Sequence, residues 1–368
     1  MKIDPIRAGL ALFVIVIVYL TLYPFSLSAI PREGLSWSVP SSRGEWMDAL
    51  LNCYFFLPFG FFGGLLVPGW RGVLWTGLGG ALLSFTVESI QLYIPMRDGS
   101  YRDILLNTIG ALSGAGLAQL AIVKRLRLHR VADGWSPHLQ ALLLAGIWVV
   151  AEWSPLVPSL RVSNIPRVFF DGGPWVPIVA VAFAGFAISR LLPLLVSRQA
   201  LPWLRLLVLV AIPMQFFLMA RSVRAIEVAG TLLGVVAGFW VPAAGSAAMA
   251  IAALAVLALR QFTPFQWEPT AVNSFGWMPL AGAFRIPPDQ GFRIMIEKLF
   301  FVTYPIWAVR RGFGTSWWSA VLGVTALVGV GEIGQLYQPG RVPEIADFLI
   351  CGLGGLMLVL TDDRAVIE

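Results

Sequence analysis

The sequence has little charge and few residues that could hold a metal ion. Only 12% of its 368 residues are charged, whereas about 25% is usual in a soluble globular protein. It contains two histidines and two cysteines, and a classical zinc site needs a cluster of such ligands. Cys53 and Cys351 each lie inside an apolar run, so we expect free thiols. The sequence predicts no metal site, no cofactor and no catalytic residue.

Apolar residues are abundant and occur in long runs. Hydrophobic residues make up 58% of the chain, with 15 Trp and 24 Phe. A helix needs about 20 mostly apolar residues to cross a bilayer. Twelve such stretches are present: 8–23, 49–67, 72–94, 103–123, 138–153, 174–197, 203–220, 226–243, 245–260, 292–310, 317–336 and 344–361. We therefore predict an all-α, polytopic transmembrane bundle of about twelve helices.

A polar pattern occurs twice with the same spacing and a third time in weakened form. The first copy reads Glu88, Gln91, Arg97, Asp103, Asn107, Gly110 and Gly114; another reads Glu332, Gln335, Arg341, Asp347, Cys351 and Gly354; a middle copy reads Gln215, Arg221, Glu227, Thr231, Gly234 and Gly238. Each copy begins with a helix that ends near a proline, Pro24, Pro155 or Pro264. We predict three repeats, 1–130, 131–244 and 245–368, with four helices each. An even helix number makes these repeats parallel in the membrane.

The basic residues indicate an orientation. Lys2 and Arg7 precede the first helix, four basic residues crowd the segment 124–130, and Arg310 and Arg311 follow the tenth helix. The positive-inside rule places these clusters and both termini in the cytoplasm, and the motif loops outside. We interpret the net charge of +6 as topology and contact with anionic lipids. We expect no nucleic-acid partner, and the sequence identifies no protein partner.

The motif residues are the candidate ligand-binding residues. Glu88 and Gln91 share a helix face, and Asp103 and Asn107 begin a stripe that continues as glycine. Charged groups near a bilayer usually mark a functional site. The candidates, with Asp48 and Asn52 added because they lie one helical turn apart in an apolar helix, are Asp48, Asn52, Glu88, Gln91, Arg97, Arg102, Asp103, Asn107, Glu332, Gln335, Arg341 and Asp347.

The three copies differ in which polar residues they contain. In the third copy, Glu297 and Lys298 predict an ion pair within their helix. The middle copy has Ile212 in place of the motif glutamate, and we interpret it as scaffold. In all copies, a Glu/Arg/Asp set is also compatible with a structural clasp that closes each pair of helices.

The pattern resembles the VanZ-like family of bacterial membrane proteins. The matching positions are Asn52, Pro58, Gly60, Glu88, Gln91, Arg97, Arg102, Asp103, Asn107 and Gly110. The resemblance is strong over residues 20–120 and extends to Glu332–Gly354, where Cys351 replaces Asn. It implies a bacterial inner-membrane protein of the cell envelope, and the founding members are associated with resistance to teicoplanin. It implies no catalytic role for these residues.

Three functional hypotheses remain. The first is a module that binds an envelope glycolipid or lipid-linked sugar at its outer side, with Arg97 and Arg102 on the phosphate. The second is a structural scaffold or a transporter. The third is a membrane-embedded enzyme on lipid-linked substrates, in which Glu88 or Asp103 is the general acid or base. We favour the first, with membrane lipids and lipid-linked glycans as the expected partners.

Overall fold

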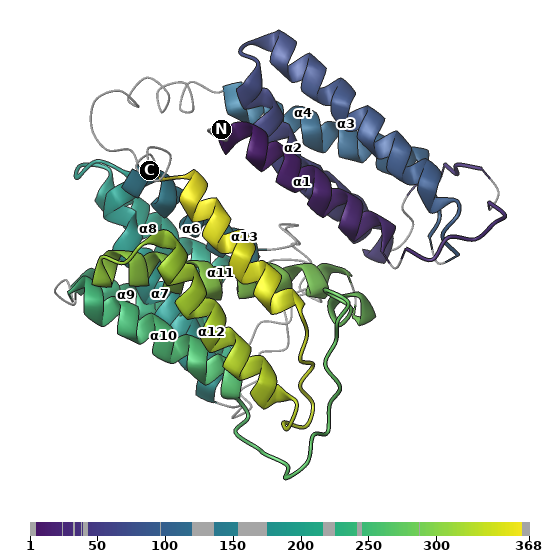
Figure 1. The fold of residues 1–368 in the computed structure, drawn as a ribbon. Helices are drawn as coiled ribbons and strands as arrows, with labels where there is room; N and C mark the ends of the chain where they lie inside the picture. Colours follow the sequence, from purple (N-terminus) through teal and green to yellow (C-terminus); the bar gives the residue numbers. More distant parts are fainter. Residues whose placement is uncertain are drawn as a thin grey trace. The chain divides into compact units, whose positions relative to one another are not determined.

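The computed structural model confirms the all-α fold. It describes residues 5–23, 25–31, 34–37, 39, 43–95, 97–119, 136–153, 175–215, 225–240, 245–286 and 288–362. These residues form twelve α-helices, one for each predicted apolar stretch, and β-structure among them is limited to two isolated bridges (Figure 1). The chain divides into two compact units, Met1–Trp135 and Ser136–Glu368.

The described residues of the first unit form four helices. They are α1 (Pro5–Leu22), α2 (Arg43–Leu66), α3 (Trp70–Gln91) and α4 (Tyr101–Gln119). Helix α2 packs most extensively on α4, and α3 also packs on α4 (Figure 1). One small hydrophobic core of this unit contains Ile17, Phe56, Phe59 and Ala111. Pro58 lies inside α2, which continues through it.

Helix α3 buries its small and polar residues and exposes its large apolar ones. The buried residues are Gly72, Thr76, Gly77, Gly80, Ser84, Val87, Glu88 and Gln91. The exposed large apolar residues are Trp70, Leu74, Trp75, Leu78, Leu82 and Phe85. Lipid solvates large apolar side chains as well as a protein interior does, whereas small residues allow helices to approach closely. This distribution is typical of a membrane helix.

Glycines on α4 allow its backbone to touch that of α2. A methyl group at Gly110 would overlap the carbonyl oxygen of Cys53, and one at Gly114 would overlap that of Leu57. On the other side of the contact, a methyl group at Gly60 would overlap the carbonyl oxygen of Ala111. The glycine end of the motif stripe therefore permits close packing of α4 on α2.

The second unit contains eight α-helices within its described residues. They are α6 (Ser136–Trp153), α7 (Trp175–Leu195), α8 (Leu201–Met214), α9 (Ala225–Trp240), α10 (Ser246–Phe262), α11 (Pro288–Phe313), α12 (Trp317–Gln335) and α13 (Ala346–Leu360), with a short 3-10 turn at Ala283–Arg285. Helix α11 is central, because α6, α10, α12 and α13 all pack against it (Figure 1). It contributes Phe300, Tyr304 and Trp307 to a core that includes buried residues from all eight helices.

The unit boundary near residue 135 lies close to the predicted end of the first repeat. The predicted second and third repeats, 131–244 and 245–368, contribute to the single core of the second unit. The same helix-pair packing is seen there, because a methyl group at Gly234 of α9 would overlap the carbonyl oxygen of Ala182 in α7. The division into three repeats stays a prediction.

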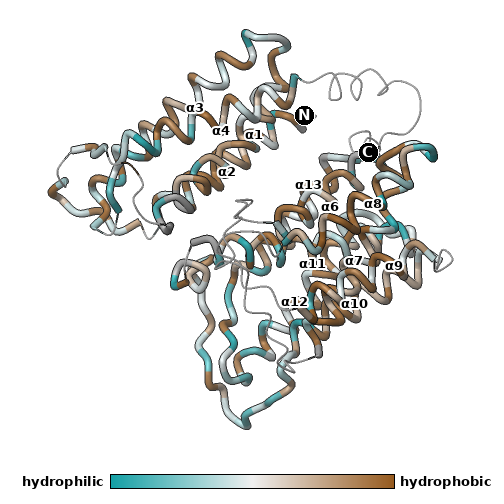
Figure 2. Tube along the Cα trace, turned by 180° about the vertical axis from the view of Figure 1, so that it is seen from behind, coloured by the Kyte–Doolittle hydropathy of each residue, from teal (hydrophilic) through white to brown (hydrophobic). Residues whose placement is uncertain are grey.

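Four of the helices are long and apolar enough to cross a bilayer within the described residues. They contain Ala49–Leu66, Trp70–Gln91, Val176–Leu195 and Trp317–Gln335. Six further apolar helices are 17 residues or shorter in their described parts, and twelve crossings stay a prediction. Figure 2 shows apolar residues along the helices and hydrophilic residues concentrated near their ends and connections. The chain is a membrane protein.

The α2–α4 contact predicts that a glycine-to-alanine substitution changes the stability of the protein differently at two positions of α4. Gly110→Ala should destabilise the protein by about 1–3 kcal/mol, because the added methyl group meets backbone and the helices must separate. Gly116→Ala is the control, because nothing lies within 4 Å of an added methyl group there. It should be neutral or stabilising by up to about 1 kcal/mol. Thermal unfolding in detergent measures both, and equal effects would contradict the packing argument.

Candidate functional site

In each unit, the loop before the last helix pairs with a distant loop through backbone hydrogen bonds. In the first unit, the Ser36 amide donates to the Gly99 carbonyl at 3.0 Å, and the Tyr101 amide donates to the Ser36 carbonyl at 3.0 Å. In the second unit, Gly276 makes the same two bonds with Pro343 and Ile345, both at 2.9 Å. Both pairings are parallel bridges. We call each pairing, with the motif residues beside it, a loop junction.

A buried glutamate holds each loop junction to the helix before it. Glu88 Oε2 accepts a hydrogen bond from the Ser100 amide at 2.8 Å. Glu332 Oε2 accepts one from the Glu344 amide, also at 2.8 Å and again twelve residues along the chain. The two glutamates are 3% and 1% exposed. A carboxylate that satisfies a buried amide in this way is a structural clasp.

The motif glutamines connect each loop junction to the end of an earlier helix. Gln91 Nε2 donates to the Thr21 carbonyl at 2.9 Å. Gln335 Nε2 donates to Gln261 Oε1 at 2.9 Å and to Glu332 Oε1 at 3.1 Å. Both glutamines are buried. The polar groups of Glu88, Gln91, Glu332 and Gln335 are therefore engaged with the protein itself.

The middle motif makes the corresponding contact. Gln215 Nε2 donates to Glu152 Oε2 at 3.2 Å. Thr21, Glu152 and Gln261 each lie three residues before the proline that follows their helix in sequence. Sequence analysis did not identify these three partners, although their shared distance from a proline was the available signal. Arg221 of the middle motif lies outside the described residues.

Asn107 stabilises the α3–α4 pair. It is buried, and its Nδ2 donates to Ser84 Oγ of α3 at 2.9 Å. Asn52 is half-buried in α2 and is not part of these hydrogen bonds. The side chain of Asp48 lies outside the described part of the structure.

Arg97, Arg102 and Asp103 form the partly accessible portion of the first loop junction. Arg102 Nε lies 3.0 Å from Asp103 Oδ1, and each side chain is 16% exposed. Arg97 is half-buried in the turn before them. The Arg102 guanidinium has further donors beyond Nε, which a phosphate oxygen can accept. This part of the first junction combines two guanidiniums with one carboxylate.

The corresponding part of the second loop junction is an ion-pair network. Lys298 Nζ contacts Asp347 Oδ1 at 2.5 Å and Glu344 Oε1 at 3.8 Å. Arg341 donates from Nη2 to the Arg260 carbonyl at 3.3 Å. Burial lowers the pKa of Arg341, and the nearby carboxylates of Glu332 and Asp347 oppose this effect.

The predicted ion pair between Glu297 and Lys298 is wrong. Glu297 Oε1 instead lies 2.8 Å from Arg260 Nη2 of α10, and Lys298 contacts the start of α13. Adjacent residues on a helix point in different directions, about 100° apart, so each side chain finds a partner on a different helix.

The remaining predictions concern cysteine and metal. Cys53 and Cys351 are free thiols, as expected. Within the described residues, no three His, Cys, Asp or Glu side chains gather closely enough to hold a metal ion.

Comparison with known proteins assigns the first unit. Residues 10–122 match the family model described as VanZ/LLP1. This region is a VanZ-like domain. The match contains α2, α3, α4 and all the residues of the first loop junction, and it covers less than a third of the chain. No curated protein matches, and no solved structure matches.

The clasp in the VanZ-like domain predicts a difference between two substitutions of one residue. Glu88→Ala should destabilise the protein by about 1–3 kcal/mol, because the buried Ser100 amide loses its acceptor. Glu88→Gln should retain most of the stability, because its amide oxygen can still accept that bond. Thermal unfolding and limited proteolysis at the loop around Ser100 measure the effect. If both variants lose the same amount of stability, the charge of Glu88 is required and not the hydrogen bond alone.

Proposed function

We propose that the VanZ-like domain binds the phosphorylated headgroup of an envelope glycolipid or lipid-linked sugar at its loop junction. Arg97 and Arg102 bind phosphate oxygens, and Asp103 accepts hydrogen bonds from sugar hydroxyl groups. Because Glu88, Gln91 and Asn107 already bond to protein groups, they support this proposal by holding the junction in shape.

The observation that carries this proposal is a group of exposed aromatic residues in the loops that form the charged junction. Phe25, Trp37, Tyr93 and Tyr101 are exposed large aromatic side chains, and all lie in or beside the loops that form the junction. Trp and Tyr concentrate at the level of lipid headgroups. Half-buried arginines at that level are placed to meet lipid phosphate.

We place the protein in the bacterial inner membrane, with several passes and both termini in the cytoplasm. The basic clusters at the N-terminus, at 124–130 and at Arg310 and Arg311 support this orientation. The loop junctions then face outward, where envelope glycolipids are exposed. A contribution to glycopeptide resistance is part of the same proposal, since it would act through such lipids.

A structural scaffold is the second candidate function. The observation in its favour is that the clasp and the glutamine contact occur in both units. In that case, Arg97, Arg102 and Asp103 would only close the junction.

Lipid retention tests the proposal. The protein is reconstituted in nanodiscs of phosphatidylglycerol that contain a polyprenyl-diphosphate-linked sugar, and bound lipids are measured by native mass spectrometry. Arg102→Gln should reduce retention of the lipid-linked sugar about tenfold, which corresponds to about 1.4 kcal/mol. Asp103→Asn should retain binding of polyprenyl phosphate but lose preference for the sugar-bearing form.

Arg71→Gln is the matched control. Arg71 is at the other end of α3, where it contacts the ring of Trp70, so this variant loses the same charge on the opposite membrane side. It should retain lipid as wild type does. If Arg102→Gln and Arg71→Gln both keep the lipid-linked sugar while remaining folded, the binding proposal is wrong and the scaffold function is favoured.

A further inference from the structure

A long non-helical segment of the second unit, residues 263–282, connects α10 to the 3-10 turn before α11. Figure 1 shows that it passes beyond the ends of α10 and α12 before it returns to α11. The Val272 amide donates to the Leu336 carbonyl at 2.9 Å, and the pairing of Gly276 described above adds two further backbone bonds. We call residues 263–282 the aromatic segment. Its backbone is thereby fixed against the α12–α13 loop and the second loop junction.

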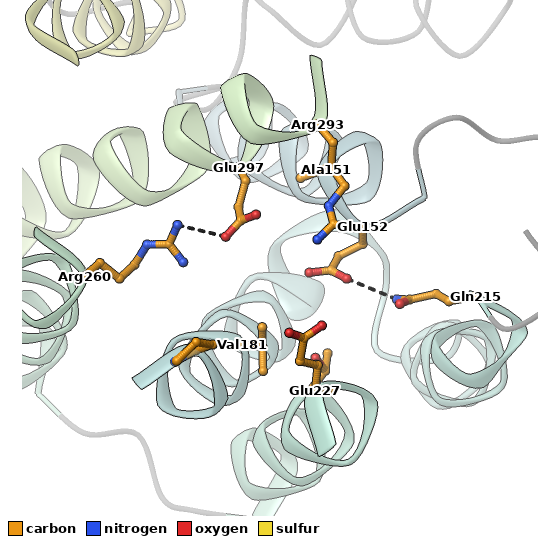
Figure 3. Close-up of a pocket in the computed structure, with 10 residues that line it drawn as sticks. Ala151, Glu152, Val181, Gln215, Glu227, Arg260, Arg293 and Glu297 are labelled. Carbon is orange, nitrogen blue, oxygen red and sulfur yellow. Dashed lines mark hydrogen bonds and ion pairs between the residues drawn. The ribbon is translucent and has the colours of Figure 1, made fainter. Parts of the chain in front are cut away.

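The end of α10, where the aromatic segment begins, is held in place by its last arginine. Arg260 Nη2 lies 2.8 Å from Glu297 Oε1 of α11, and its guanidinium stacks 4.0 Å from the centre of the Phe301 ring. This ion pair borders a cavity of about 60 Å³ that Glu152 and Glu227 also line (Figure 3). The aromatic segment therefore leaves the helices at a defined point.

The aromatic segment exposes large apolar side chains although its backbone is bonded to the protein. Trp267 is 51% exposed, and Trp277 is 77% exposed. Three further apolar residues are exposed: Phe265, Val272 and Met278. Glu268 is the single charged residue of the segment. A large exposed apolar surface marks an interaction site, and the low charge favours an apolar partner over an ionic one.

The surface of the aromatic segment continues the exposed apolar surface of α12, a helix long and apolar enough to cross a bilayer. Ile333, in the last turn of α12, is 63% exposed. At the next residue, Gly334, an added methyl group would lie 3.1 Å from the Trp267 ring. Trp267 also packs on Phe262 in the last turn of α10, with the ring centres 6.1 Å apart. Trp267 therefore lies at the ends of two membrane helices, where tryptophan usually meets lipid headgroups.

The first unit has an exposed tryptophan at the corresponding position. Trp37 follows Ser36 of the first bridge as Trp277 follows Gly276 of the second. Trp37 is 63% exposed. The residues around the two tryptophans differ, whereas the membrane is common to both units. This recurrence favours the membrane surface as the partner over a protein that recognises one unit.

We propose that the aromatic segment lies in the headgroup layer of the bilayer and inserts Trp267 and Trp277 among the lipids. The partner is the lipid surface itself, whatever the charge of its headgroups, because the segment has one charged residue. Since the segment is bonded to the α12–α13 loop, it holds the second loop junction at a fixed depth. The contact lies in the second unit, so it does not depend on glycolipid binding by the VanZ-like domain.

A fluorophore on a single cysteine measures the depth of the aromatic segment in the full-length protein. The chain has only two cysteines, and the background variant is Cys53→Ala/Cys351→Ala. The fluorophore is attached at Met278→Cys, which leaves both tryptophans in place, or at Glu268→Cys, the matched control; both positions are exposed. Nanodiscs of phosphatidylcholine or of phosphatidylglycerol contain a lipid with a nitroxide on its headgroup, and iodide is the quencher in water.

The label at position 278 should be quenched by the headgroup nitroxide about twofold more than the label at position 268, because apolar side chains enter the headgroup layer and a glutamate faces water. Iodide should give the reverse order, and both lipids should give the same result. Trp277→Glu should make the label at position 278 accessible to iodide, since a charged side chain leaves the layer. Trp277→Phe should keep the quenching by lipid.

A second measurement keeps both natural cysteines. The difference in tryptophan fluorescence between wild type and Trp277→Phe reports the indole of Trp277. This difference should be quenched by the headgroup nitroxide and not by iodide.

Three outcomes would overturn the proposal. If iodide quenches the label at position 278 as strongly as the label at position 268, the aromatic segment faces water. If neither quencher reaches position 278, a protein surface such as a second copy of this chain covers the segment. If the lipid quenches only in phosphatidylglycerol, the contact is ionic and not apolar.

Discussion

The organisation of both loop junctions depends on one interaction, a buried carboxylate that accepts a backbone amide hydrogen bond. In the VanZ-like domain it joins Glu88 to Ser100, and in the second unit it joins Glu332 to Glu344. A loop at the end of a membrane helix has amides that the helix cannot satisfy, and leaving one buried without a partner is costly. The carboxylate solves this problem and thereby fixes the start of the last helix. In the VanZ-like domain, the position of this helix start in turn sets the positions of Arg102 and Asp103.

A second constraint acts within the membrane, where the hydrophobic effect does not drive helices together. The α2–α4 and α7–α9 pairs instead approach until backbone touches backbone at Gly110 and Gly234. Dispersion contacts between the closely packed helices stabilise such pairs. The polar residues at the ends and the glycines in the middle of the same motif therefore act together, because the glycines set the helix spacing that the hydrogen bonds at the end require.

Much of the fold was predictable from the sequence, because apolar runs of sufficient length can form only helices in a bilayer. The motif and its family were predictable because spacing is preserved along the chain. The partners of the polar groups were not. Gln91 bonds to a carbonyl 70 residues away, and Glu297 and Lys298 point to different helices. The cavity around Glu227 could not be predicted either, since it requires side chains from helices of two predicted repeats to converge.

The inverted burial of α3 has an evolutionary consequence. In a water-soluble helix, the large apolar residues are the ones under strict selection, and the surface drifts freely. In this chain, Leu74, Leu78 and Leu82 face outward and can be exchanged for any apolar residue that lipid accepts. In contrast, Gly77, Gly80 and Ser84 are buried against Leu112, Ala111 and Asn107 of α4, where a larger side chain would disturb the packing. Over evolution, the exposed apolar residues of such a protein change from one apolar type to another. The glycine, serine and buried polar residues remain as a sparse pattern. Distant members of the family should therefore be recognisable by their smallest residues.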